Sequence, residues 1–196
     1  VFNSDGRQLP VTTCHTPILT VTQIKTDDKR DGYTAIQFAI AGTKKAKKPI
    51  ADKLKKLKLK LSPQFFIEFK PENIDQLPKI GDSLTIDSVF SVGDKVAITG
   101  YSKGRGFAGV IKRHGFHRQP VTMGASDRTR STGAIGAQTP GRVIKGKRMP
   151  GHFGNKNITV KNIEIIDINK ELSTITFKGC IPGHINSYLT IKKHYA

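Results

Sequence analysis

The sequence predicts a mostly β protein with one short helix and one long, basic, irregular extension loop. Segments rich in β-branched residues recur at a spacing of roughly 8–12 residues, separated by turn signals, which is typical of a barrel or sandwich. This pattern stops at Tyr101 and resumes after Lys156. We therefore expect residues 1–100 and 157–196 to form one β body. Residues 101–156 should leave it between two strands and return to it.

The expected strands follow from the alternation of apolar and polar residues. They are Val11–Thr22 with a bend at Pro17, Tyr33–Ile40, Phe65–Phe69, Leu84–Phe90, Lys95–Tyr101, Ile158–Ile168, Ser173–Lys178 and Tyr188–Lys192. The acid-rich stretch DDKRDG predicts a turn after the first strand. The stretch SVGD predicts a hairpin that joins the fourth and fifth strands.

A basic insert at about residues 43–62 interrupts the strand pattern and predicts one short helix. Pro49 suits the first turn of a helix, and Asp52 suits its positive N-terminal end. Four apolar residues at helical spacing would share one thin face: Ile50, Leu54, Leu57 and Leu61. A basic amphipathic helix could lie on a membrane or bind a partner. This one is brief and lacks an aromatic residue, so we expect it to pack on its own domain.

The net charge of +18 is concentrated in two segments. Residues 43–60 contain nine Lys and one acid, and residues 101–156 contain twelve Lys or Arg and a single acid, Asp127. The rest of the chain is therefore close to neutral. Two basic segments on a neutral body are typical of a nucleic-acid-binding protein, because a bound polyanion offsets the repulsion within them.

The extension at residues 101–156 also contains eleven Gly and three His, and its apolar residues follow neither a strand nor a helix period. Such a segment buries too little apolar surface to order itself. We expect it to be disordered in the free protein and ordered by a polyanion. Glycine lets backbone approach a phosphate closely, and arginine pairs with phosphate bidentately. An irregular basic arm fits the crevices of folded RNA better than a DNA groove.

Three clusters in the extension are expected to bind phosphates: Lys103 with Arg105, Lys112 with Arg113 and Arg118, and Arg142 with Lys145, Lys147 and Arg148. The imidazoles of His114 and His117 could stack on bases or bond to phosphate. Single aromatic residues could stack on exposed bases or act as plugs that tie the base of the extension to the β body. For Phe107 we favour the plug.

Context argues against several other functions. Gly104–Gly109 matches G-x-G-x-x-G, but the following VIKRHGFHRQP has no helical apolar face, so we expect no dinucleotide or other cofactor. His114 and His117 have no acid or Cys neighbour that would complete a metal site. Without paired carboxylates or a nucleophile beside a base, we expect no catalysis and no small-molecule substrate.

Cys14 and Cys180 form no C-x-x-C motif and indicate a reducing compartment. No run of the sequence approaches the ~18 apolar residues that span a bilayer.

Several long motifs stand out: GYSKGRGFAGVIKRHGF, GAIGAQTPGRVIKGKRMPGHFGN, ITVKNIEII and FKGCIPG, with FNSDGRQLPVT and DGYTAIQ nearer the start. These motifs resemble the L-three family of large-ribosomal-subunit proteins, of the bacterial and organellar type. The likeness covers almost the whole chain and is densest from Lys95 to Gly183. The family usually opens with a K-x-G-M-T segment, so we expect further residues upstream of Val1.

The resemblance implies a translation-protein-type β-barrel and a loop that threads the large-subunit rRNA towards the peptidyl-transferase centre. It also implies a role early in subunit assembly, no enzymatic activity, and neighbouring large-subunit proteins as further partners. The implied rRNA-binding residues are Lys103, Arg105, Lys112, Arg113, His114, His117, Arg118, Arg128, Arg130, Arg142, Lys145, Lys147, Arg148, His152 and Lys156. The implied loop tip comprises Gly136, Ala137, Gln138, Thr139 and Pro140. Some bacterial members carry a methylated glutamine before T-P-G, which makes Gln138 a candidate for methylation.

The predicted function is thus a structural constituent of the large ribosomal subunit that binds its rRNA. We expect it in a bacterial cytoplasm, or on an organellar ribosome if the source is eukaryotic. The alternative is a free-standing RNA-binding or RNA-chaperone protein whose loop samples many RNAs without a fixed site.

Overall fold

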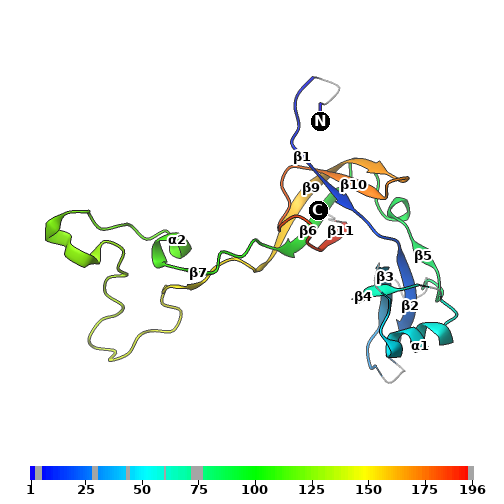
Figure 1. Ribbon diagram of the computed structural model, residues 1–196, viewed down its shortest axis with the longest axis horizontal. Coiled ribbons are helices and arrows are strands. Elements are labelled where there is room, and N and C mark those ends of the chain that lie inside the picture. The colour runs from blue at the N-terminus through cyan, green and yellow to red at the C-terminus, as the bar shows by residue number, and fades with distance from the viewer. Residues whose placement is uncertain (3–5, 28–30, 43–44, 60, 72–76, 194–196) are drawn as a thin grey trace. The chain divides into compact units, whose positions relative to one another are not determined.

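Three β-sheets supply most of the regular secondary structure of the computed structural model, which describes residues 1–2, 6–27, 31–42, 45–59, 61–71 and 77–193 (Figure 1). The strand orders are β1-β10-β9-β6-β11, β4-β3-β2-β5 and β7-β8. The predicted class, mostly β with short helices and a basic extension, is confirmed. The described strands form open sheets and not one closed barrel.

The elements follow one another along the chain as strands, two α-helices and two 3-10 helices (η). They are β1 (Val11–His15), β2 (Leu19–Lys25), β3 (Ala35–Ala41), α1 (Lys48–Lys56), β4 (Pro63–Phe69), β5 (Ser83–Leu84), η1 (Ile86–Ser88), β6 (Lys95–Tyr101), β7 (Phe107–Ala108), α2 (Val110–His114), η2 (Met123–Arg128), β8 (Gly151–His152), β9 (Asn157–Asn169), β10 (Thr174–Lys178) and β11 (Leu189–Lys193).

The chain divides into two units. The first comprises Val1–Val96, Asn162–Cys180 and Lys193–Ala196, and the second comprises Ala97–Lys161 and Ile181–Lys192. The helix α1 belongs to the first unit, and the whole extension belongs to the second.

The four-stranded sheet of the first unit is held by a small apolar cluster. Val21, Ile36 and Phe38 are buried, and the rings of Phe38 and Phe69 meet edge to face with centroids 5.9 Å apart. A bulge interrupts the pairing of β2 with β3 between Val21 and Gln23. Because a bulge breaks the two-residue alternation, Val21 and the next residue, Thr22, are both buried.

In the other sheet β10 alternates regularly, although its pairing with β9 shifts register between Thr176 and Phe177. Ile165, Ile175 and Phe177 are almost fully buried, while the residues between them along β10 are more exposed. The two strands join at a tight turn in which the Ser173 N–H donates to the Lys170 carbonyl over 3.2 Å. These side chains supply much of the apolar burial in this part of the first unit, each contributing on the order of 2 kcal/mol.

In the second unit, β6 and β11 approach each other closely at a glycine. A Cβ on Gly100 would lie 2.6 Å from the Leu189 Cδ2 atom. A side chain there would displace the end of the Leu189 side chain and crowd the Pro182 carbonyl oxygen at 3.1 Å, so glycine suits this position. Across β6 and β9, the hydroxyl groups of Thr99 and Thr159 share a hydrogen bond of 2.8 Å.

The helix α1 lies at the predicted insert, although residues 43, 44 and 60 of that insert fall outside the described residues. Leu54 is 2% exposed, so the thin apolar face packs on the protein's own unit as expected. The helix ends where Lys58 adopts a left-handed conformation (φ 56°), and the Leu59 N–H donates back to the Leu54 carbonyl over 3.0 Å.

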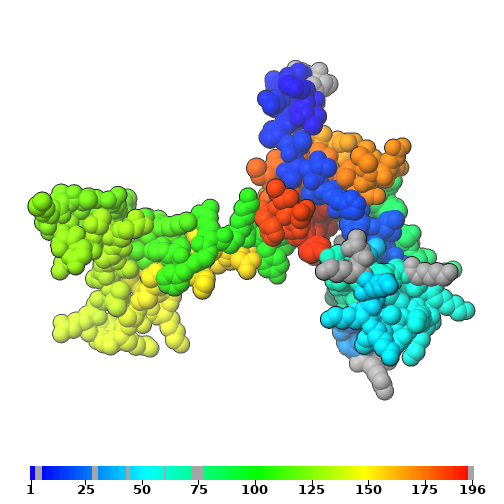
Figure 2. Space-filling view, viewed as in Figure 1, coloured from blue at the N-terminus to red at the C-terminus, as the bar shows by residue number. Residues whose placement is uncertain are grey.

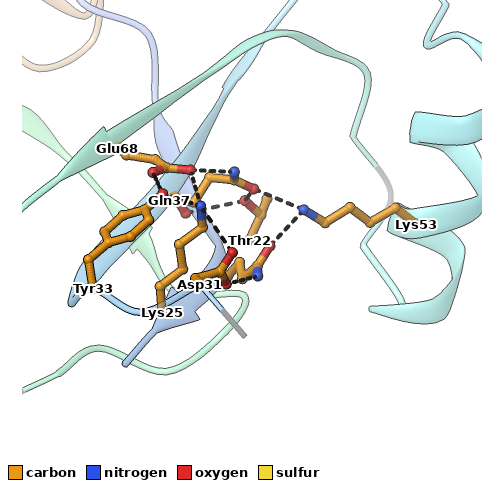
Figure 3. Close-up of polar contacts among 8 residues, drawn as sticks. Thr22, Lys25, Asp31, Tyr33, Gln37, Lys53 and Glu68 are labelled. Atoms are coloured by element: carbon orange, nitrogen blue, oxygen red, sulfur yellow. Dashed lines mark hydrogen bonds and ion pairs between the residues drawn. The ribbon is translucent and has the colours of Figure 1, made fainter. Parts of the chain in front are cut away.

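A polar network fixes α1 to the sheet (Figure 3). The Lys53 Nζ atom donates to the Oε1 atoms of Gln23 and Gln37, at 2.9 and 3.0 Å, and lies 5.6 Å from the Phe66 ring centroid. The buried Thr22 hydroxyl also donates to Gln37 Oε1, over 3.1 Å. Neutral amide oxygens, and not a carboxylate, therefore hold the inward-facing lysine of this basic helix.

A second part of the network orients the Gln37 amide. Its Nε2 atom donates to Glu68 Oε1 over 3.1 Å. The Glu68 carboxylate also accepts from the Tyr33 hydroxyl over 2.7 Å and pairs with Lys25 over 2.9 Å. Since the Gln37 nitrogen is engaged by a carboxylate, its oxygen is directed to Thr22 and Lys53.

Three sequence predictions need correction. The segment Val11–Thr22 is split into β1 and β2 around Pro17, because proline lacks the N–H that a continuous strand needs. Leu84–Phe90 is not a strand: β5 ends at Leu84, and η1 follows, closed by the Ser88 hydroxyl on the Thr85 carbonyl at 2.7 Å. The hairpin predicted at SVGD is therefore wrong, and β6 instead neighbours β9 and β11. The predicted DDKRDG turn includes residues 28–30, which lie outside the described residues.

We predict that Lys53→Met lowers the free energy of unfolding by about 1 kcal/mol, because it removes both hydrogen bonds to the glutamine oxygens while keeping the length of the side chain. Urea unfolding would measure this loss, and amide exchange would show faster opening of α1. The matched control is Lys56→Met, which changes an exposed lysine on the same helix. Equal effects of the two substitutions would contradict the tethering role of Lys53.

The Glu68 carboxylate should make stability depend on pH. The hydrogen bond from Lys25, with those from Tyr33 and Gln37, lowers the pKa of Glu68 from 4.5 to about 2. Because the folded value is the lower one, the stabilisation is present above pH 4.5 and is lost as pH falls towards about 2. We expect the difference in urea midpoint between wild type and Glu68→Gln to shrink through this window. A difference that stays constant between these pH values would refute the assignment.

Candidate nucleic-acid interface

The extension begins as a paired stem, visible in Figure 1 as two limbs running side by side at β7. Ser102 N–H donates to the Lys156 carbonyl, and Arg105 N–H donates to the Phe153 carbonyl, each over 2.9 Å. Further along, Phe107 pairs with His152 in the β7–β8 ladder. The base of the extension therefore has regular backbone pairing, which its sequence did not predict.

Glycine makes this pairing possible at one position. Gly154 has φ +77°, and a Cβ there would lie 2.2 Å from the Lys103 carbonyl oxygen. The two limbs could not approach each other with any side chain at this site. This glycine thus serves the stem itself, whereas the composition had suggested close approach to a phosphate.

A single helical turn, α2, follows β7. Ala108 and Val110 are buried, and the helix stops at Gly115, which has φ 71° and donates its N–H to the Ile111 carbonyl over 2.9 Å. The sequence had shown no helical apolar face after G-x-G-x-x-G, and the helix that forms there is only five residues long. The segment VIKRH contains too few apolar residues to show a helical period in the sequence.

Two side chains of α2, Arg113 and His114, contact the Met149 carbonyl of the returning limb and form what we call the Met149 clasp. The Arg113 Nη1 atom donates to the Met149 carbonyl over 2.7 Å, and the His114 Nε2 atom lies 3.1 Å from the same oxygen. The guanidinium also lies where a Cβ on Gly151 would be, 2.6 Å from Nη1. Arg113 and His114 are thus two predicted RNA-binding residues whose side chains reach a backbone carbonyl of the opposite limb. The sequence could not predict this contact, because the shared acceptor is a backbone carbonyl and every residue has one.

The aromatic rings of the stem are arranged differently from the prediction. Phe107 is 71% exposed and meets the His152 ring edge to face at 5.9 Å, so its interpretation as a plug against the β body is wrong. Strand alternation explains this, because it turns Ala108 inward and Phe107 outward. The Arg105 guanidinium lies 5.1 Å from the Phe153 ring centroid. A residue predicted to bind phosphate thus lies over one of the single aromatic rings predicted to stack on bases.

Beyond the clasp, the chain opens into a wide loop (Figure 2). Gln119 N–H donates to the Thr129 carbonyl over 3.1 Å, and η2 lies between them. The carboxylate of Asp127 accepts a hydrogen bond from the Ser126 hydroxyl, which lowers its pKa. The predicted tip, residues 136–140, is exposed throughout, and a turn brings Gly141 N–H to the Gln138 carbonyl at 3.0 Å.

Most of the predicted RNA-binding side chains are free to meet a ligand. Of the fifteen, all except Arg113 and His114 are exposed. The ion pairs of the described residues include none that involves residues 101–156. The exposed ones are Lys103, Arg105, Lys112, His117, Arg118, Arg128, Arg130, Arg142, Lys145, Lys147, Arg148, His152 and Lys156. They line both limbs and the loop and form a surface of unneutralised positive charge.

Two other classes of site are absent from the described residues. Within the described part of the chain, no three His, Cys, Asp or Glu side chains gather in a way that could hold a metal ion. Among the same residues, no helix has the length and apolar character needed to cross a membrane.

Mostly β structure with a long, exposed cationic hairpin is typical of basic nucleic-acid-binding proteins. The family model described as Ribosomal protein L3 matches residues 67–177. Proteins named "Large ribosomal subunit protein uL3" are similar over 98% of this chain: 41% identical in Herpetosiphon aurantiacus, 40% in Carboxydothermus hydrogenoformans and 43% in Desulforapulum autotrophicum. The aligned region covers 90%, 91% and 92% of those proteins, respectively. The chain belongs to the ribosomal protein L3 family, which confirms the resemblance seen in its motifs.

We predict that Gly154→Ala disrupts the stem, because its Cβ would collide with the Lys103 carbonyl in addition to straining a positive φ. Gly106→Ala is the matched control, since Gly106 has φ +63° but nothing within 4 Å of the added Cβ. Amide exchange at Arg105 and Phe153 should accelerate on the order of tenfold more in Gly154→Ala, as expected for a further ~1.4 kcal/mol. Similar exchange in the two variants would show that the close approach does not hold the stem.

Proposed function

We propose that this protein is a structural constituent of the large ribosomal subunit. In this proposal the body, residues 1–100 and 157–196, docks on the large-subunit rRNA and on neighbouring large-subunit proteins. The extension, residues 101–156, penetrates the rRNA. Its tip around Gln138 reaches towards the peptidyl-transferase centre, and binding of the protein nucleates early assembly of the subunit.

The observation that carries this proposal is the exposed, unpaired charge of the extension. Phosphates are the natural partners of a surface with twelve basic side chains and one acid, whose carboxylate is already hydrogen-bonded to Ser126. Backbone contacts of this kind position a protein on RNA without reading its sequence. The names of the relatives, all large ribosomal subunit proteins, support rRNA as the particular polyanion.

The stem and the loop beyond it have different parts in this function. The paired stem and the Met149 clasp give the extension a defined direction. The wide loop has few internal bonds, so its order should come from the RNA that surrounds it. Phe116, which is half-buried, and Phe153, whose ring centroid lies 5.1 Å from the Arg105 guanidinium, are the candidates to stack on unstacked bases. Gln138, exposed at the tip, is the candidate for methylation.

We further propose that the protein contributes no catalysis and needs no cofactor or small-molecule substrate. Its place is on the ribosome, and the bacterial relatives favour a bacterial cytoplasm over an organelle.

Gradient sedimentation of native lysate, with and without a high-salt wash, tests the proposal. We expect the chain to sediment with the large subunit and to stay there through the wash, because a hairpin threaded into folded RNA cannot leave by exchange of counterions alone. A variant with Arg142, Lys145, Lys147 and Arg148 changed to glutamine should be incorporated less well. If salt strips the wild-type chain to the top of the gradient, a free-standing RNA-binding or RNA-chaperone protein would replace this proposal.

A further inference from the structure

The outward face of α1 carries a second concentration of positive charge, which a single acid offsets only in part. Six lysines in and around the helix are exposed: Lys45, Lys47, Lys48, Lys55, Lys56 and Lys58. Asp52 is the only acid between residues 45 and 59, and it pairs with Lys55 alone, at 3.8 Å. At 100° per residue, Lys48, Lys55 and Lys56 fall within about a third of the helix circumference. By the same count Asp52 lies within this arc, so the three lysines and one acid form a face with a net charge of +2 on one helix.

The remaining lysine of the helix explains why this face points outward. Lys53 is held by the Gln23 and Gln37 oxygens, so rotation of α1 about its axis would break both hydrogen bonds. Figure 3 shows Lys53 extending from α1 to Gln37, whose amide is in turn directed by Glu68. The chain of contacts from Glu68 through Gln37 to Lys53 thus sets which face of the helix is displayed.

The same contacts leave the charge of the helix intact. Lys53 binds neutral amide oxygens, and the nearby Glu68 carboxylate is engaged by Lys25, Tyr33 and Gln37. The two contacts of Lys53 therefore add no negative charge next to the lysines of α1. A face of this kind costs repulsion unless a polyanion binds it.

The apolar surface around α1 distinguishes among possible ligands. Leu54 is buried on the sheet, so no apolar face remains for insertion into a membrane. The exposed large apolar side chains of the described residues include none between residues 34 and 79. A protein partner normally needs a buried apolar or aromatic anchor, which this face does not offer. Flexible lysine point charges suit the phosphate backbone of RNA.

We infer that the Lys48–Lys55–Lys56 face of α1 is a second RNA-phosphate-binding site, separate from the extension. It lies in the first unit, whereas the extension lies in the second, so it gives the body its own electrostatic contact with RNA. The inference rests on the proposed function only in taking the large-subunit rRNA as the RNA to be tested.

The test measures binding of the full chain to purified bacterial large-subunit rRNA across a range of salt concentrations. The α1 variant changes Lys48, Lys55 and Lys56 to glutamine, and an extension variant changes Lys145, Lys147 and Arg148 to glutamine. A third variant removes the same charge from scattered exposed lysines, Lys70, Lys79 and Lys192. A fourth keeps the charge of the helix by replacing its three lysines with arginine.

Each lost phosphate contact should reduce the steepness of log K against log salt by roughly 0.7–0.9. We therefore expect the slope to become shallower by about 2 in the α1 variant and by a similar amount in the extension variant. The scattered variant should bind with the wild-type slope, and so should the arginine variant. Since the sites are separate, the two reductions should add when both sets of substitutions are combined.

An α1 variant that keeps the wild-type slope, while the extension variant does not, overturns the inference and leaves the proposed function standing. The reverse result would retain the α1 site and refute the role of the extension. If the α1 variant keeps its slope on RNA but no longer joins the large subunit, the face binds an acidic protein and the RNA assignment is wrong. Loss of slope in the arginine variant would mean that the substitutions act through the fold of α1.

Discussion

Unpaired positive charge is the constraint on which the rest of this structure depends. Two segments carry almost all of the net charge of +18, and neither is neutralised by acids of its own. Charges of one sign repel, so each segment must be attached to the protein by contacts that do not depend on pairing its charges with acids. The apolar contacts available are small: Leu54 in α1, and Ala108 with Val110 at the start of the extension.

Both basic segments are held by the same kind of polar contact. In α1 the Lys53 ammonium binds two glutamine oxygens, and in the extension the Arg113 guanidinium binds the Met149 carbonyl. In each case a cation is paired with a neutral oxygen. The contact fixes geometry without removing positive charge, so both segments keep their full attraction for a polyanion. Carboxylates in the same places would have held the segments equally well and weakened that attraction.

Specific residues show how far sequence reasoning reaches. The strands at Lys95–Tyr101 and Ile158–Ile168 were predicted closely, because one buried face imposes strict alternation. The stem of the extension was not predicted, because its pairing depends on Gly154 and on backbone bonds between residues about 50 positions apart. Phe107 was assigned inward because it is large and apolar, and the alternation of β7 turns it outward. Of the thirteen exposed side chains of the candidate interface, eight were predicted from clusters of charge, one from its imidazole and four from the family resemblance.

The sequence by itself determined the class of fold, the position of the two basic segments and the family. Those properties rest on composition, local alternation and long contiguous motifs, all of which are written along the chain. Only the tertiary structure decided which cations are displayed and which are used internally. Arg113 and Lys53 look like their neighbours in sequence, and they differ because folding brings the Met149 carbonyl to one and the Gln23 and Gln37 oxygens to the other. Contacts between residues distant in the chain make that selection, and no local pattern encodes them.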